Sequence, residues 1–93
     1  MYFDNNFKNN LYKNTQIDAD EKVLKYILRK CAEITPYKKI DNKGRKSAYY
    51  TFLIYDKLVT IVADYEKGKI VTGVIETRWW RFKNEIENVK IYQ

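Results

Sequence analysis

The 93-residue chain has no histidine, one cysteine and one proline. Without histidine, Ser-His-Asp triads, imidazole metal sites and the histidine acid/base pair common in RNases are excluded. Cys31 cannot form an intramolecular disulfide, and its place on the apolar side of a predicted helix indicates a small buried side chain. No apolar run approaches the ~18 residues of a transmembrane helix. There is no P-loop, GxGxxG or CxxC motif and no carboxylate spacing typical of a metal site, so neither cofactor nor metal is predicted.

What the chain does have is positive charge and many aromatic residues. It carries 18 Lys and Arg against 12 Asp and Glu, a net charge of +6, and 16% aromatic residues, nine of them tyrosine. With 45% apolar residues it can bury a core, which excludes intrinsic disorder, and its length indicates one domain over residues 1–93. The charge favours an anionic partner, the lack of a long apolar run indicates no membrane span, and the absence of a secretory signal favours the cytoplasm.

One or two helices are expected before the first strand. Residues 1–16 are polar and rich in asparagine, and form either a flexible segment or a short helix from about residue 4 to residue 13. A clearer amphipathic helix follows, because apolar residues recur at helical spacing from Val23 to Ile34. Asp18 and Glu21 fit a capping box at its start, and a proline ends it.

Three antiparallel strands follow, over about Ser47–Tyr55, Leu58–Tyr65 and Lys69–Thr77, with turns at Asp56-Lys57 and Lys67-Gly68. Alternation along these strands predicts two faces. The face expected to pack on the helices carries Tyr50, Phe52, Ile54, Val59, Ile61, Ala63, Tyr65, Ile70, Thr72 and Val74. The other face carries Tyr49, Thr51, Leu53, Tyr55, Leu58, Thr60, Val62, Asp64, Val71, Gly73 and Ile75.

After the strands, Trp79, Phe82 and Ile86 fit a helical stripe, which predicts a short C-terminal helix, and residues 89–92 could form a last edge strand. The sequence therefore predicts an α+β fold. One or two N-terminal helices pack on one face of a three- to four-stranded antiparallel sheet, and a short C-terminal helix follows.

The leading functional candidate is the basic segment of residues 37–47, expected to be a loop or the base of a hairpin. Five Lys and Arg stand there against one Asp, which gives a net charge of +4. Such density attracts phosphates whatever the sequence bound. The alternative is an ordinary solvated turn. Beside the segment, the tyrosines of the first strand could stack on bases, or simply be strand residues. In the tail, a tryptophan between arginines could serve stacking or partner docking, or cap the core. The candidate nucleic-acid-binding residues are Lys38, Lys39, Tyr49, Tyr55, Trp80 and Arg81.

Cleavage of RNA without histidine remains chemically feasible. The reaction needs a base for the 2′-hydroxyl, charge stabilisation at the phosphate and a proton for the leaving oxygen. Clustered Lys, Arg and Tyr can supply these roles, because neighbouring positive charges lower the pKa values of Lys and Tyr. The candidate catalytic residues are Lys43, Arg45, Lys46 and Arg78. Thr72 could also bind a phosphate, but the expected register places it on the core face.

The order of these segments resembles a known family. An amphipathic helix precedes a basic Asn-Lys-Gly-Arg turn and an antiparallel meander, and the stretch DYEKGKIVT (Asp64–Thr72) ends it. Over about residues 18–77 the chain resembles the small RNase toxins of the barnase/EndoU/colicin/RelE superfamily, especially the RelE-like and BrnT-like toxins. The resemblance implies an α+β fold and a metal-independent endoribonuclease that uses Arg, Lys and Tyr. It implies that Lys43, Arg45 and Lys46 line the substrate edge and that Arg78 contacts the scissile phosphate.

Three hypotheses follow. The first is an RNA-directed toxin of RelE-like fold from a mobile element, neutralised by an acidic antitoxin. The second is a non-enzymatic phage- or plasmid-encoded protein that binds nucleic acid or inhibits a host nucleoprotein. The third is an interaction module that dimerises through Trp79 and Trp80.

Overall fold

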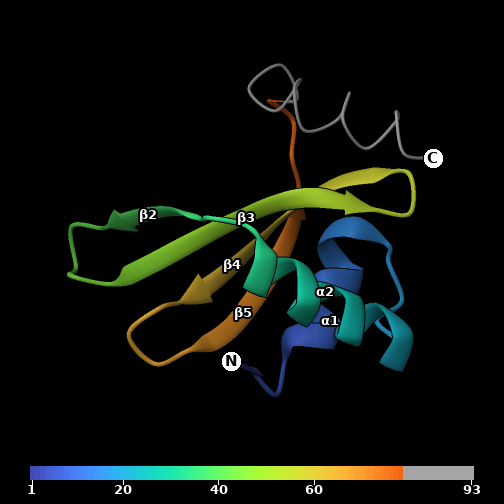
Figure 1. The fold of residues 1–93 in the computed structure, drawn as a ribbon, viewed down its shortest axis with the longest axis horizontal. Helices are drawn as coiled ribbons and strands as arrows, with labels where there is room; N and C mark the ends of the chain where they lie inside the picture. Colours follow the sequence, from blue (N-terminus) through green and yellow to red (C-terminus); the bar gives the residue numbers. More distant parts are fainter. Residues whose placement is uncertain (79–93) are drawn as a thin grey trace.

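The computed structural model describes residues 1–78, which form two helices on one face of a five-stranded sheet (Figure 1). The elements are β1 (Tyr2–Phe3), α1 (Phe7–Thr15), α2 (Glu21–Glu33), β2 (Tyr37–Ile40), β3 (Lys46–Ile54), β4 (Lys57–Asp64) and β5 (Lys69–Ile75). The strand order is β1-β5-β4-β3-β2, with β1 parallel to β5 and every other pair antiparallel. The α+β class is confirmed. No helix of the described residues is long and apolar enough to cross a membrane.

The sheet is larger than predicted, and it is mixed rather than wholly antiparallel. The sequence pattern missed β1 because it has only two residues, and these pair with Lys69 and Ile70 at the far end of the described chain. The segment of β2 was expected to be a loop or the base of a hairpin, and it is a full edge strand. All four of its residues are exposed, so no apolar alternation marks it as a strand. The predicted C-terminal helix and the strand at residues 89–92 lie outside the described residues.

The N-terminal segment forms the shorter of the two helices, and the start of the second corrects the predicted cap. The capping box is wrong: the N-cap of α2 is Asp20, whose Oδ1 accepts a hydrogen bond from the N–H of Val23 at 2.9 Å. Asp18 lies earlier, in the connection between the helices. Since Asp20 directly precedes the first helical residue, its carboxylate reaches the free N–H groups of the first turn, whereas Asp18 is too far along the chain.

The predicted faces are correct for β3 and β4 and reversed for most of β5. The first turn lies at Tyr55-Asp56, one residue earlier than expected, so Ile54 pairs with Lys57. This error moves each cross-strand pair by two residues, which leaves the faces unchanged. In β5, however, Val62 pairs with Thr72 and Ala63 with Ile70. Val71 is thus the extra residue of a β-bulge. Beyond it, Thr72 and Val74 turn to the outer face, and Gly73 turns to the core.

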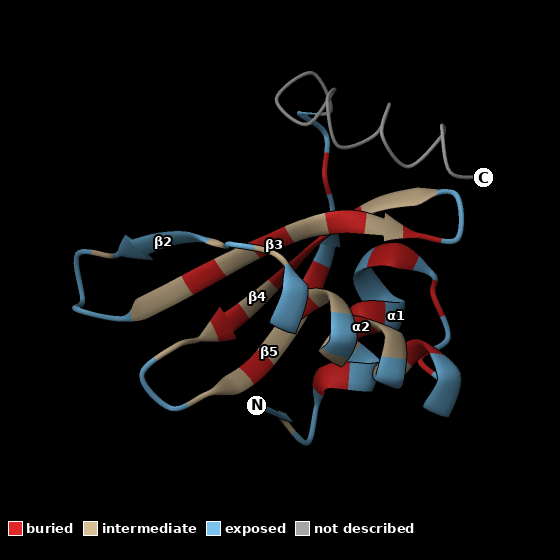
Figure 2. Ribbon diagram, in the orientation of Figure 1, coloured by how far each residue is buried: buried red, intermediate tan, exposed pale blue. Residues whose placement is uncertain are grey.

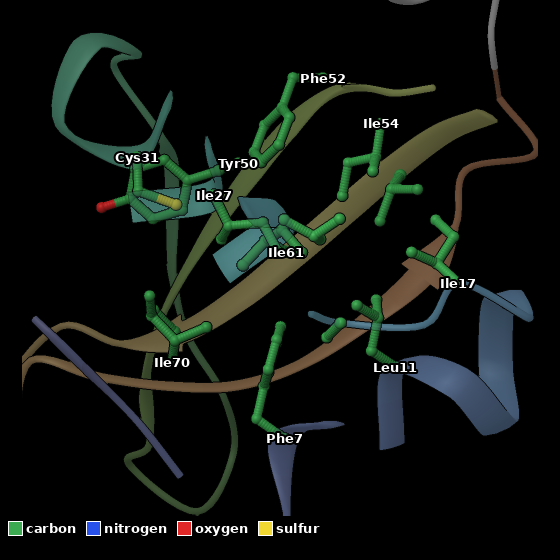
Figure 3. Packing of buried hydrophobic residues seen from close by; sticks show 14 of the residues in the cluster. Phe7, Leu11, Ile17, Ile27, Cys31, Tyr50, Phe52, Ile54, Ile61 and Ile70 are labelled. Atoms are coloured by element: carbon green, nitrogen blue, oxygen red, sulfur yellow. The ribbon is translucent and has the colours of Figure 1, made fainter. Parts of the chain in front are cut away.

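The core lies between the helices and one face of the sheet. In Figure 3 the side chains of Phe7 and Leu11 converge from α1 on Ile61 and Ile70, and Ile27 of α2 completes the centre. All five are 0% exposed. α1 packs mainly on β5, whereas α2 packs on β3. The helices thus cover one end of the sheet's inner face, while the outer face of β3 and β4 is only partly buried (Figure 2).

Candidate nucleic-acid interface

The basic segment predicted from the sequence forms the β2–β3 hairpin, at one edge of the sheet. Figure 1 shows this hairpin extending beyond the helices, at the end of the longest axis of the molecule. Along that axis the molecule extends 38 Å, against 27 and 22 Å along the others. All of β2 and residues 42–45 of the turn are exposed. The largest local concentration of positive charge therefore stands on the most projecting part of the described chain.

Asp41 shapes the turn of the hairpin. Its Oδ1 accepts the backbone N–H groups of Lys43, at 2.9 Å, and Arg45, at 2.8 Å. Its Oδ2 accepts the Nε–H of Arg45. The backbone hydrogen bond from Arg45 is the main cause that lowers the pKa of the Asp41 carboxyl. Gly44 adopts a φ of 78°, which glycine tolerates without strain. The one acid of the segment thus stabilises the turn and forms an ion pair with Arg45.

The hairpin has two chemically different sides. On the side of the helices, the Nζ of Lys38 lies 5.0 Å from the centre of the Tyr65 ring. On that same side the Nζ of Lys46 lies 3.8 Å from a carboxylate oxygen of Glu66. Both lysines therefore have partners within the fold, one through a cation–π contact and one through a partly exposed ion pair.

The outer side of the hairpin carries a tyrosine pair and a lysine. Tyr37 pairs across the ladder with Tyr49, and their ring centres lie 6.2 Å apart at 40°. Lys39, which is exposed, follows on the same side, opposite Ser47. Neither Lys39 nor Lys43 of the turn forms an ion pair with any residue that the structure describes. These two ammonium groups and the exposed guanidinium of Arg45 are the cations that can face a ligand.

Arg78 lies at the other end of the sheet. Its backbone N–H and its Nε–H both donate to Oε1 of Glu76, at 2.8 and 3.1 Å. The other oxygen of Glu76 accepts the hydroxyl of Thr60 at 2.9 Å, and that hydroxyl also contacts Thr51 at 2.8 Å. Burial alone would raise the pKa of Glu76, but the hydrogen bonds from Arg78 and Thr60 outweigh it, and the net shift is downward.

The four candidate catalytic residues are therefore not brought together. Glu76 hydrogen-bonds through its N–H to the carbonyl of Leu58, which pairs with Leu53 of β3. From Lys46 to Leu53 is seven residues of strand, roughly 23 Å at about 3.3 Å per residue. Arg78 thus stands a strand's length from the basic turn that holds the other three candidates.

The remaining candidates divide in the same way. Tyr55 is 69% exposed, but it forms the β3–β4 turn at the end of β3 away from the basic turn, with a φ of 57°. The predicted register placed Thr72 in the core, and this is wrong. Thr72 lies beyond the bulge, and its Oγ1 accepts a hydrogen bond from the side-chain amide of Asn14 at 3.3 Å. Trp80 and Arg81 lie outside the described residues.

Two negative findings limit other chemistry within residues 1–78. Cys31 is buried, and this burial raises the pKa of its thiol to about 12, so it stays protonated and unreactive near neutral pH. No group of three or more Cys, Asp or Glu side chains in this described part of the chain could hold a metal ion.

The sequence reasoning missed Tyr37. The available signal was its spacing from the turn. In a hairpin whose turn spans Asp41–Arg45, Tyr37 lies opposite Tyr49. The expectation of a loop or the base of a hairpin did not include this pair. Tyr37 is 70% exposed, the largest exposed fraction of any aromatic residue in the described strands.

Comparisons with known proteins identify no relative: no family model, no curated protein and no solved structure matches this chain. The resemblance to the small RNase toxins therefore stays a prediction.

Proposed function

We propose that this protein binds nucleic acid through the β2–β3 hairpin. The observation that carries the proposal is the position of the charge: a net +4 on residues 37–47, raised on a hairpin that projects beyond the helices. Cations on a projecting ribbon can approach several phosphates at once, and each neutralised phosphate releases condensed counterions. The proposed location is the cytoplasm, where such a partner is accessible without export.

The proposal is for binding and not for cleavage. Cleavage requires the base, the proton donor and the charge-stabilising group to meet at a single phosphate, within hydrogen-bond reach of the reacting atoms. Arg78, roughly 23 Å along the sheet from the basic turn, is held by Glu76 and lies too far away to act there. Binding needs only that the cations be presented on one surface, which the hairpin does.

The test removes charge from the hairpin without changing its turn. In a Lys39→Gln/Lys43→Gln variant, both substituted side chains are exposed and Asp41 keeps its partners, so the hairpin should persist. We expect roughly tenfold or greater loss of affinity for a fluorescent 20-nucleotide RNA at about 50 mM salt, measured by anisotropy, because two phosphate contacts are lost.

The matched control is a Lys8→Gln/Lys22→Gln variant, which removes the same charge from exposed positions on α1 and α2. Its affinity should stay within about twofold of the wild type, because diffuse charge contributes less than a phosphate contact. Equal losses in both variants would show non-specific attraction by net charge and reject the hairpin as the site. The same samples on a denaturing gel should show intact RNA; cleavage by the wild type would favour the ribonuclease hypothesis instead.

A further inference from the structure

The residues on the outer side of the hairpin indicate which form of nucleic acid it binds, on the assumption that the proposed function holds. We propose that the hairpin binds a single-stranded segment, one of whose bases stacks on the Tyr37 ring. The observations are the 70% exposure of Tyr37, its packing against Tyr49, and the exposed Lys39 on the same side.

The tyrosine pair provides an aromatic surface on which a base can stack. Tyr49 is half-buried, and it supports one side of the Tyr37 ring at a centroid distance of 6.2 Å. The rest of the Tyr37 ring faces solvent. Because Tyr49 restricts the Tyr37 ring on one side, the tyrosine side chain loses less conformational freedom when a base stacks on it than an isolated tyrosine would. Stacking on an aromatic ring tolerates any base, since every base has a π face.

Charge stands next to this surface. Lys39 is two residues from Tyr37 on the same side of β2, roughly 7 Å away along the strand. Lys43 and Arg45 follow in the turn. A single strand lying along the outer side of β2 would place one base on Tyr37 and its following phosphates on these cations. The helix side lacks this combination, because Lys38 covers the Tyr65 ring and Lys46 pairs with Glu66.

A duplex does not fit the same surface. In a double helix the faces of the bases are stacked on one another and only their edges are open in the grooves. An exposed tyrosine ring therefore gains nothing from intact duplex. A two-stranded β-ribbon can enter the major groove of B-DNA, and this competing mode makes the opposite prediction of a duplex preference.

The experiment compares a 12-nucleotide single-stranded RNA, the same sequence as DNA, and the matching DNA duplex, each labelled and titrated at one salt concentration. We expect the wild type to bind both single strands more tightly than the duplex. Tyr37→Leu should weaken single-strand binding about tenfold and leave duplex binding unchanged. Tyr37→Phe, which keeps the ring, should bind as the wild type does.

The control is Tyr12→Leu, which removes an exposed tyrosine from α1 on the other side of the sheet. It should change nothing, and far-UV circular dichroism should show that all variants remain folded. A duplex preference, or wild-type affinity in Tyr37→Leu, would overturn the single-strand inference. If Lys39→Gln/Lys43→Gln still loses affinity in that case, the proposed function stands. If the wild type binds none of the three nucleic acids, both the proposed function and the single-strand inference fail.

Discussion

Replacing Gly73 with valine is expected to lower the free energy of unfolding by about 3 kcal/mol, because it overpacks the contact between β5 and α1. The bulge at Val71 turns position 73 into the core, where a Cβ would lie 2.6 Å from Cδ1 of Leu11 and 3.0 Å from Cδ1 of Ile61. Leu11 is fully buried and has little room to move. The midpoint of urea unfolding, followed by far-UV circular dichroism, measures the loss.

Leu11→Ala supplies the test of this contact. Alone it should destabilise the protein by about 2–5 kcal/mol through the cavity it leaves. Combined with Gly73→Val, it opens the space that the valine needs. The loss of stability in the double variant should therefore be smaller than the sum of the two single losses by about 0.5–3 kcal/mol. Val74→Ala, at the exposed neighbouring position, should change stability by less than about 1 kcal/mol. Strict additivity of the Leu11 and Gly73 changes would contradict the packing described.

Glu76→Gln is expected to destabilise the fold by about 1–2 kcal/mol at neutral pH. The carboxylate is almost wholly buried, with a side-chain exposure of 5%, and it accepts hydrogen bonds from Thr60 and from two groups of Arg78. The glutamine has a similar shape but no negative charge, so the hydrogen bonds from Arg78 lose the charged acceptor. Its amide NH2 must also donate to Thr60, where the carboxylate oxygen accepted. Glu66→Gln, an exposed glutamate near the other end of the sheet, should change stability by less than about 0.5 kcal/mol.

The pH dependence of the Glu76 variant follows from the lowered pKa of this group in the folded state. An unfolded glutamate has a pKa of about 4.3, so the contribution of the charged form is complete above about pH 5. This contribution is lost as the pH falls below about 4.3 and then through the lower pKa that Glu76 has in the folded state. The difference in free energy of unfolding between the wild type and Glu76→Gln should therefore become smaller as the pH is lowered. A difference that is constant from about pH 7 to pH 3 would show that the charge of Glu76 does not matter.

The parts of the fold that the sequence predicted are those with a regular apolar period. The Val23–Ile34 stripe marks α2, and alternation in β3 and β4 gives their buried faces even though the turn between them was misplaced by one residue. The predicted faces of the second half of β5 were wrong, because a bulge adds one residue and moves every later side chain to the opposite face. Gly73 was the available signal, since a lone glycine within a strand is typical of a bulge or of close packing.

The candidate site was predicted in composition but not in arrangement. Counting charges located the basic segment, because charge density is a property of the sequence itself. Which lysines have partners depends on Tyr65 and Glu66, which reach the hairpin only through the β3–β4 register. The separation of Arg78 from the basic turn follows from the antiparallel meander itself, because its first strand begins beside Lys46 and its third strand ends before Arg78. The candidate catalytic set was chosen by residue type and did not use this geometry.

The most direct test of the hairpin as the binding surface is the salt dependence of its affinity for single-stranded RNA. A plot of log K against log salt should be linear for the wild type, and its slope should be less negative in Lys39→Gln/Lys43→Gln by about 1.4, or about 0.7 for each lost phosphate contact to a single strand. Lys8→Gln/Lys22→Gln should give the wild-type slope. If the hairpin variant and the wild type give the same slope, these lysines do not contact phosphates, and the hairpin is not the nucleic-acid interface.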